Sequence, residues 1–134
     1  MEETKNKLLL VDDDASSLME MIGFLKDDYE ISTAKNAYSA IERARTFEPD
    51  IILLDVVMPG MNGFEAMNDL KQLEKTKSIP VIFVSGADDN SDERKGLELG
   101  AIDYIKKPVD EVILKLRLKH HISIINKLRT LAED

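Results

Sequence analysis

Four apolar residues, Ile51 to Leu54, lead directly to a carboxylate at Asp55, and a turn follows at Pro59 and Gly60. A short apolar run bounded by turn residues is typical of a strand buried on both faces of a sheet. Such a strand would hold Asp55 at its C-terminal end. In open α/β sheets, ligands bind in the crevice beyond these ends, so the stretch predicts a layered α/β fold with a polar site at Asp55.

The rest of the chain alternates between strand-like and helix-like segments. The predicted strands are residues 8–11, 29–34, 51–55, 80–85 and 102–105. Between them, apolar residues recur at helical spacing, as Leu18, Met21, Ile22 and Leu25 do after the first strand. The alternation is typical of βαβ units, so we expect an α/β fold with a doubly wound, five-stranded parallel sheet.

Two of the predicted helices differ from the others. Residues 87–100 are polar and acidic, and only Leu97 and Leu99 are large and apolar, so we expect a short, weakly anchored helix there. The last helix, residues 109–131, would be about 34 Å long. It carries an approximate heptad seam with exposed Ile and Leu, which favours pairing. We therefore expect residues 1–120 to form the domain, and residues 121–134 to extend the helix as a dimerisation element or as a link to an output domain.

Composition excludes several classes of protein. The 134 residues fit one domain, and the absence of cysteine excludes disulfides, thiol nucleophiles and thiolate metal sites. The net charge of −8 argues against direct nucleic-acid binding and against an anionic membrane surface. The first apolar run is too short for a signal peptide, and no segment is long enough to cross a membrane. These features predict a soluble protein of the cytoplasm.

Polar residues stand at the C-terminal ends of four predicted strands. They are Asp12 and Asp13, then Asp55, Ser85 and Lys107. In a doubly wound sheet these ends lie along one edge, so the side chains should converge. Three carboxylates repel one another, and one lysine offsets only part of that repulsion. A hard divalent cation, Mg²⁺ or Mn²⁺, is the natural partner of such an oxygen-rich site.

A bound cation would also admit a phosphoryl group, because it cancels the negative charge that would otherwise repel phosphate. Asp55 can then act as a nucleophile and form an acyl phosphate. Lys107 and Ser85 supply donors for the phosphoryl oxygens. Phosphoryl transfer requires little beyond alignment and charge neutralisation, and this set of residues provides both.

Four segments together resemble the receiver domain of bacterial two-component response regulators. The segments are residues 10–14 (LVDDD), 55–63 (DVVMPGMNG), 84–87 (VSGA) and 100–108 (GAIDYIKKP). Each alone is a weak signal, but all four occur in the order of the family and span nearly the whole chain. The resemblance implies a flavodoxin-like (CheY-like) fold with strand order 2-1-3-4-5 and an extended C-terminal helix. It also implies a phosphorelay function, with a sensor histidine kinase or a phosphotransfer protein as the donor.

The resemblance assigns the acidic residues to one site. Asp55 would be phosphorylated, and Asp13 and Asp55 would bind Mg²⁺ together with the backbone carbonyl of Val57. Asp12 would assist through water or from behind the ligands. The domain would catalyse only its own phosphoryl transfer and dephosphorylation, so we do not expect an enzyme acting on external substrates.

The resemblance also assigns residues that bind the phosphoryl group and respond to it. Lys107 would hold its oxygens, and we choose Lys107 over Lys106 because it directly precedes Pro108, where the family usually has a cis peptide bond. Ser85 would bond the phosphoryl group and, with Tyr104, would act as a switch that reports its presence to the surface.

Simpler interpretations exist for each residue alone. The acidic run at residues 12–14 could only cap a helix, Asp55 could be a solvated turn residue, and Ser85 could be an ordinary strand-end hydroxyl. Tyr104 could be packing alone. The pair His120 and His121 is most simply a solvated helix face.

Other functions compete with phosphorylation. A module of the same fold could be left unphosphorylated and signal by docking alone, although the complete acidic set and Lys107 argue against that. An enzyme of the dehalogenase type needs a second aspartate two residues after the nucleophile, where this chain has Val57. A flavodoxin-like cofactor binder needs a phosphate loop after the first strand, where this chain has three aspartates, and no GxxxxGK[ST] loop occurs.

Overall fold

Five parallel strands form a single sheet in the order β2-β1-β3-β4-β5. The computed structural model describes residues 4–86 and 90–133. The strands are β1 (Lys7–Val11), β2 (Glu30–Ala34), β3 (Ile51–Asp55), β4 (Val81–Ser85) and β5 (Asp103–Lys106). The predicted strand order and the parallel sheet are therefore confirmed, and each strand lies within a residue or two of its predicted position.

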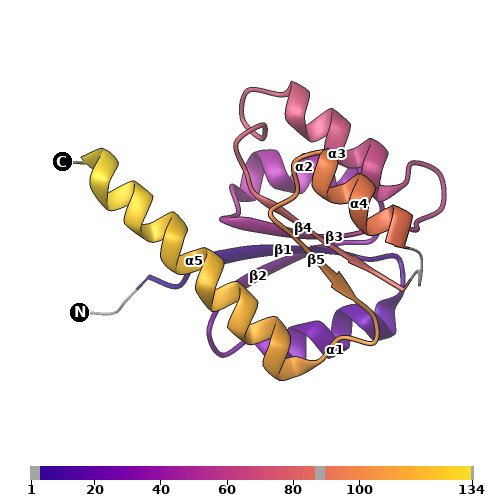
Figure 1. The fold of residues 1–134 in the computed structure, drawn as a ribbon, viewed down its shortest axis with the longest axis horizontal. Coiled ribbons are helices and arrows are strands. Elements are labelled where there is room, and N and C mark those ends of the chain that lie inside the picture. Colours follow the sequence, from indigo (N-terminus) through magenta and orange to yellow (C-terminus); the bar gives the residue numbers. More distant parts are fainter. Residues whose placement is uncertain (1–3, 87–89, 134) are drawn as a thin grey trace.

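Helices cover both faces of the sheet (Figure 1). They are α1 (Ala15–Leu25), α2 (Ala37–Phe47), α3 (Gly63–Gln72), α4 (Asn90–Glu98) and α5 (Glu111–Glu133). Figure 1 shows α2, α3 and α4 on one side and α1 with the first half of α5 on the other. The helix predicted over residues 87–100 is confirmed in α4, and the predicted positions 87–89 lie outside the described residues.

The strands are apolar on both faces because both faces are covered. Leu9 and Val11 pack with the residues of α2 and α3 in one core cluster. Leu8 and Leu10 point the other way and pack with α1 and α5 in a second cluster. Every residue of β3 is buried. The strand therefore holds Asp55 in a fixed position at the C-terminal edge of the sheet.

Side chains at the N-terminal ends of α2 and α3 cap these helices. Asn36 caps α2 as predicted, because its side chain accepts a hydrogen bond of 2.8 Å from the Ser39 backbone N–H. Asn62 and Glu65 form a capping box at α3, with bonds of 2.9 and 3.1 Å between each side chain and the other's backbone N–H. These caps fix where the loops after β2 and β3 end.

Helix α4 buries few side chains against the sheet. Leu97 and Leu99 are 47% and 39% exposed, and among residues 91–98 only Gly96 is buried. A Cβ at position 96 would lie 2.8 Å from Cδ2 of Phe83. The helix can therefore pack closely against Phe83 of β4 because position 96 has no side chain.

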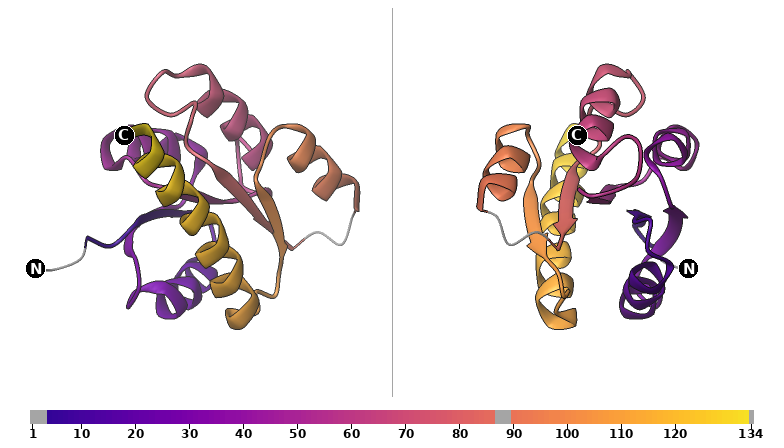
Figure 2. Two further views of the ribbon diagram at one scale, coloured as in Figure 1. Left: turned by 60° about the vertical axis from the view of Figure 1, so that its left-hand side comes forward. Right: turned by 90° about the vertical axis from the view of Figure 1, so that its right-hand side faces the viewer.

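Helix α5 continues past the sheet. Leu114, Leu118 and Ile122 are buried in the core, and the turns that follow extend beyond the strands on the side of the N-terminus (Figure 1). The left panel of Figure 2 shows the whole helix as one unbroken coil. Among the described residues, no helix combines the length and the apolar character needed to cross a bilayer.

Candidate functional site

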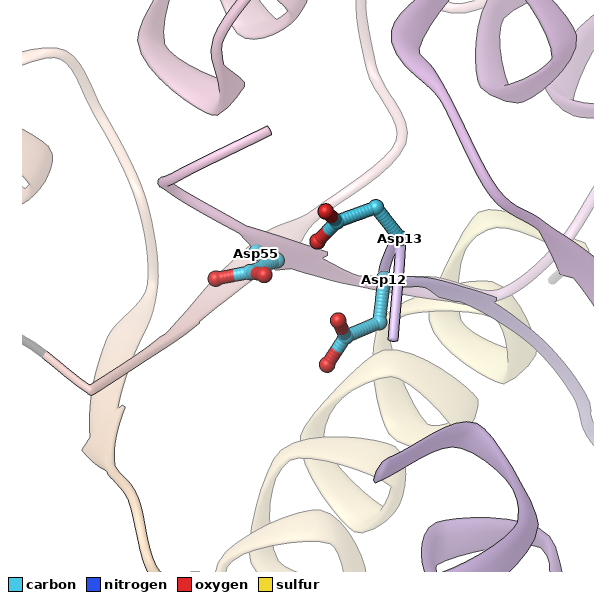
Figure 3. A group of neighbouring side chains, drawn as sticks. All are labelled: Asp12, Asp13 and Asp55. Atoms are coloured by element: carbon cyan, nitrogen blue, oxygen red, sulfur yellow. The ribbon is translucent and has the colours of Figure 1, made fainter. Parts of the chain in front are cut away.

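Asp12, Asp13 and Asp55 form an acidic site at the C-terminal edge of the sheet. Asp12 and Asp13 directly follow β1, and Asp55 is the last residue of β3. The two strands are neighbours in register, with Val11 opposite Leu54. One carboxylate oxygen from each residue lies within 4.8 Å of the other two, and Figure 3 shows the three side chains converging. The predicted convergence is confirmed for these three carboxylates.

The acidic run 12–14 both caps a helix and supplies the site. The Asp14 side chain accepts a bond of 3.0 Å from the Ser16 backbone N–H, and so caps α1. Asp12 is 1% exposed and accepts a bond of 2.9 Å from the Asp14 backbone N–H. Asp13 is exposed. Within residues 12–14, the capping interpretation therefore holds for Asp14 alone. Asp12 and Asp13 belong to the acidic site.

Lys107 enters the site from the loop after β5. Its ammonium lies 2.6 Å from Oδ2 of Asp12 and 3.5 Å from Oδ2 of Asp55. Its backbone N–H donates to the Ser85 carbonyl at 2.8 Å, which ties this loop to the end of β4. The peptide bond between Lys107 and Pro108 is cis, as the resemblance implied.

The site is short of positive charge. Burial raises the pKa of Asp55 to about 6, and the neighbouring Asp12 carboxylate contributes to the rise against the opposing effects of Lys107 and the Val57 backbone N–H. Burial alone would lower the pKa of Lys107, but its bonds and charge contacts with Asp12 and Asp55 outweigh that effect and raise it. One ammonium is thus shared between two buried carboxylates, and a third carboxylate lies beside them.

These residues fit a hard divalent cation. The donor set consists of carboxylate oxygens only, which is the set that Mg²⁺ and Mn²⁺ prefer. A dication would stabilise the ionised form of Asp55, whose pKa is raised first by burial and then by the neighbouring Asp12 carboxylate. Asp13, as the exposed member, leaves one side of the site open to solvent, where a cation that retains several waters is best accommodated.

Gly63 shapes the loop that follows Asp55. Its N–H donates to the Val56 carbonyl at 2.8 Å, which folds the loop back over the end of β3. A Cβ at position 63 would lie 2.2 Å from the Asp55 carbonyl oxygen and 2.9 Å from Cα of Val56. The sequence reasoning assigned Gly63 no role, although the capping pattern at Asn62 and Glu65 marks where the loop must end.

Ser85 and Tyr104 lie buried beside the acidic site. Ser85 is the last residue of β4 and is 0% exposed, and Tyr104 in β5 is 4% exposed. The Tyr104 hydroxyl has no hydrogen-bond partner among the described residues. Burial raises the pKa of the Tyr104 phenol, and the carboxylates of Asp92 and Glu93 add to the rise. The remaining predicted residue, Val57, follows β3 with its side chain 66% exposed.

The model of the response regulator receiver domain matches residues 8–119 of this chain. The chain belongs to that family. The match includes β1 to β5 and the whole acidic site, and it ends within α5. The receiver function and the CheY-like fold that the resemblance implied are therefore confirmed, and the bare docking module is not favoured.

Curated relatives agree with this assignment. The receiver domain is 40% identical over 114 residues to the response regulator PleD of Caulobacter vibrioides, covering 84% of this chain and 25% of PleD. It is 38% identical over 109 residues to protein PilH of Pseudomonas aeruginosa, covering 81% of this chain and 90% of PilH. The matched part makes up only 25% or 26% of the length of three of the curated relatives at 40% identity.

Solved structures show the same fold. The chemotaxis protein CheY4 of Vibrio cholerae matches with a TM-score of 0.81 at 28% identity, covering 87% of this chain and 98% of CheY4. A response regulator from Desulfuromonas acetoxidans matches with a TM-score of 0.82 at 32% identity, covering 89% of this chain and 98% of that one.

Proposed function

We propose that the domain accepts a phosphoryl group on Asp55 with the help of Mg²⁺ and changes conformation in response. The observation that supports this most is the meeting of Asp12, Asp13 and Asp55 with Lys107 at one sheet edge. Neither helix capping nor fold stability requires three carboxylates at one place with a single ammonium in contact with two of them. The excess negative charge indicates that a cation completes the site.

The proposed step is an in-line transfer to the carboxylate. An Asp55 oxygen attacks the phosphorus and forms an O–P bond, while the bond between phosphorus and the donor breaks and the donor keeps its electron pair. With a histidine donor, the imidazole nitrogen is released. Lys107, already 3.5 Å from Asp55, would move toward the new phosphoryl oxygens. Mg²⁺, when bound, would neutralise charge on those oxygens.

We assign the metal ligands to Asp13, Asp55 and the backbone carbonyl of Val57. Asp12 would act from behind them, because its two oxygens are engaged by the Asp14 backbone N–H and by Lys107. The same two contacts hold the Asp12 carboxylate in one orientation, where it can accept from a metal-bound water.

Ser85 and Tyr104 are the proposed switch. The Ser85 hydroxyl stands at the end of β4, and β4 pairs with β3 up to Asp55 opposite Val84. A phosphoryl group on Asp55 would attract that hydroxyl. Tyr104 contacts the same region through its buried ring, and a change there would reach the surface through β5 and α4. Phosphorylation would then favour a conformation already sampled without it.

The proposed partner is a sensor histidine kinase or a phosphotransfer protein acting in the cytoplasm. The domain would have no external substrate and would catalyse only its own phosphorylation and dephosphorylation. The net charge of −8 favours protein partners over nucleic acid or an anionic membrane.

A mass measurement tests the proposal. Acetyl phosphate with Mg²⁺ should add one acid- or base-labile phosphoryl group to the parent protein and none to Asp55→Asn. Asp69→Asn, which removes a carboxylate from α3 away from the site, is the matched control and should be phosphorylated like the parent. An adduct that persists in Asp55→Asn, or no adduct with any small-molecule donor, would contradict the assignment. Absence of Mg²⁺ binding in a titration would favour the docking module instead.

The domain organisation stays a proposal as well. We assign residues 1–120 to the receiver domain and residues 121–134 to a helical extension that pairs with a second copy or continues into an output domain. Leu114 and Leu118 are buried in the core and cannot pair with a second copy, whereas Leu116 in the inner half of α5 and Leu128 and Leu131 in its outer half are exposed. Sedimentation at increasing concentration, with and without phosphorylation, tests the dimer, and a strict monomer throughout would exclude it for this chain.

A further inference from the structure

The last two turns of α5 are not held by apolar packing. Ile122 is the last buried residue of the helix, and Ile125 packs only partly against the core. Beyond it, Leu128 and Leu131 are 61% and 70% exposed. Nevertheless the helix continues without a break to Glu133. Polar contacts at the N-terminal edge of the sheet hold this outer half.

Asp50 is the centre of these contacts. It directly precedes β3 and is 8% exposed. Its Oδ2 accepts bonds from the Lys7 backbone N–H at 2.7 Å and from the Asn6 side chain at 3.1 Å. Its Oδ1 forms an ion pair with Arg129 of α5. Asn6 also donates to the Asn126 side chain at 3.2 Å, across 120 positions of the chain.

The geometry gives this ion pair more weight than an ordinary surface pair. Exposed pairs contribute little because two mobile side chains must be ordered in water. Here the Asp50 carboxylate is buried and already oriented by two hydrogen bonds, so only the Arg129 side chain is ordered by the contact. The Arg129 side chain is 55% exposed and that of Asp50 only 11%, so solvent screens the pair in part, and loss of Arg129 would leave Oδ1 of a mostly buried carboxylate without its cation. The pair therefore favours one direction of the helix.

We propose that Asn6, Asp50, Asn126 and Arg129 form a latch that fixes the direction of the outer half of α5 relative to the sheet. The latch makes residues 126–133 a rigid arm rather than a flexible tail. It also attaches that arm to β3, the strand that carries Asp55 at its other end. A partner or a following segment that engages the arm is thereby held at a fixed angle to the strand bearing the acidic site.

Distances between two spin labels test the direction of the arm. The chain has no cysteine. Spin labels therefore attach only at the two cysteines introduced by Tyr38→Cys and Leu131→Cys, both at exposed positions. The labelled parent should give one narrow distance distribution. Arg129→Ala should broaden it, whereas Lys127→Ala, which removes an equal charge two positions away on the same arm, should leave it narrow. A distribution as narrow in Arg129→Ala as in Lys127→Ala overturns the latch.

Hydrogen exchange gives a second and independent readout. Arg129→Ala should speed amide exchange at residues 126–133 by about fivefold and leave the strands unchanged. Alanine has the higher intrinsic helix propensity, so faster exchange cannot arise from the substitution itself. Asp50→Asn should have a similar effect, and the double variant should exchange no faster than the faster single variant. Additive effects in the double variant overturn the pairing of Asp50 with Arg129.

Discussion

Lys107 and Asp12 are 95 positions apart in the chain, yet the Lys107 ammonium lies 2.6 Å from Oδ2 of Asp12. The same ammonium is 3.5 Å from Asp55. It therefore works as a shared counter-charge, closer to the supporting carboxylate than to the proposed phospho-acceptor. Without a phosphoryl group, the shorter contact of Lys107 is with Asp12. We expect phosphoryl oxygens on Asp55 to draw the ammonium toward that residue.

Lys107→Ala should separate metal binding from phosphorylation. Removal of a cation beside a cation site should strengthen Mg²⁺ binding by about fivefold, because a like-charge repulsion of roughly 1 kcal/mol is lost. The phosphorylated fraction reached with acetyl phosphate should fall, because the phosphoryl oxygens lose their donor. A Mg²⁺ titration and intact-mass measurement check the two effects. Lys106→Ala removes the exposed neighbour and should change neither, so equal effects in both variants would contradict this role for Lys107.

Tyr104→Phe should leave the domain as stable as the parent or more stable. The Tyr104 hydroxyl is buried and has no hydrogen-bond partner among the described residues, and such a group destabilises a fold by about 1–3 kcal/mol. Phenylalanine keeps the ring in place and removes the hydroxyl. Urea unfolding measures the difference, and Tyr38→Phe, at a position 68% exposed, should have no effect. A clear loss of stability in Tyr104→Phe would show that the Tyr104 hydroxyl forms a hydrogen bond in solution.

The acidic site was predictable because topology alone brings its members together. Parallel strands place their C-terminal ends at one edge, so Asp12, Asp13, Asp55 and Lys107 could be grouped from strand positions without any contact information. The choice of Lys107 over Lys106 rested on one neighbouring residue, Pro108. The structure places Lys106 at the exposed end of β5 and Lys107 in the site.

Contacts between single side chains were not predictable in the same way. Arg129 and Asp50 belong to no shared periodicity, and only the direction of α5 brings them together. The expectation for the histidine pair was wrong for His121, whose Nε2 lies 3.0 Å from Asp103 with the side chain 17% exposed. His120 is exposed as expected. The helical pattern could not distinguish the two positions, because Asp103 comes from β5.

Gly63→Ala should unfold the loop around Asp55 or strain it severely. The new Cβ would lie 2.2 Å from the Asp55 carbonyl oxygen, which belongs to a buried strand that cannot move aside. We expect a loss of about 2–4 kcal/mol in the free energy of unfolding, measured in urea, and weaker Mg²⁺ binding. Gly23→Ala is the matched control: nothing lies within 4 Å of its Cβ position in α1, so it should stabilise the domain by about 0.5–1 kcal/mol. Equal stability of Gly63→Ala and the parent would contradict the close approach.

Asp55→Asn should stabilise the metal-free domain at neutral pH. Because the pKa of Asp55 is raised to about 6 from its ordinary value of 3.8, the folded protein binds more protons than the unfolded chain between these values. The stability associated with this group is thus present below pH 4 and is lost as the pH rises through 6. At pH 7 the variant should exceed the parent by about 3 kcal/mol, and near pH 4 the two should converge. Urea unfolding in the presence of a chelator measures both, with the exposed Asp27→Asn as control. A stability difference between variant and parent that stays constant from pH 4 to pH 7 would show that burial and Asp12 do not raise the pKa of Asp55.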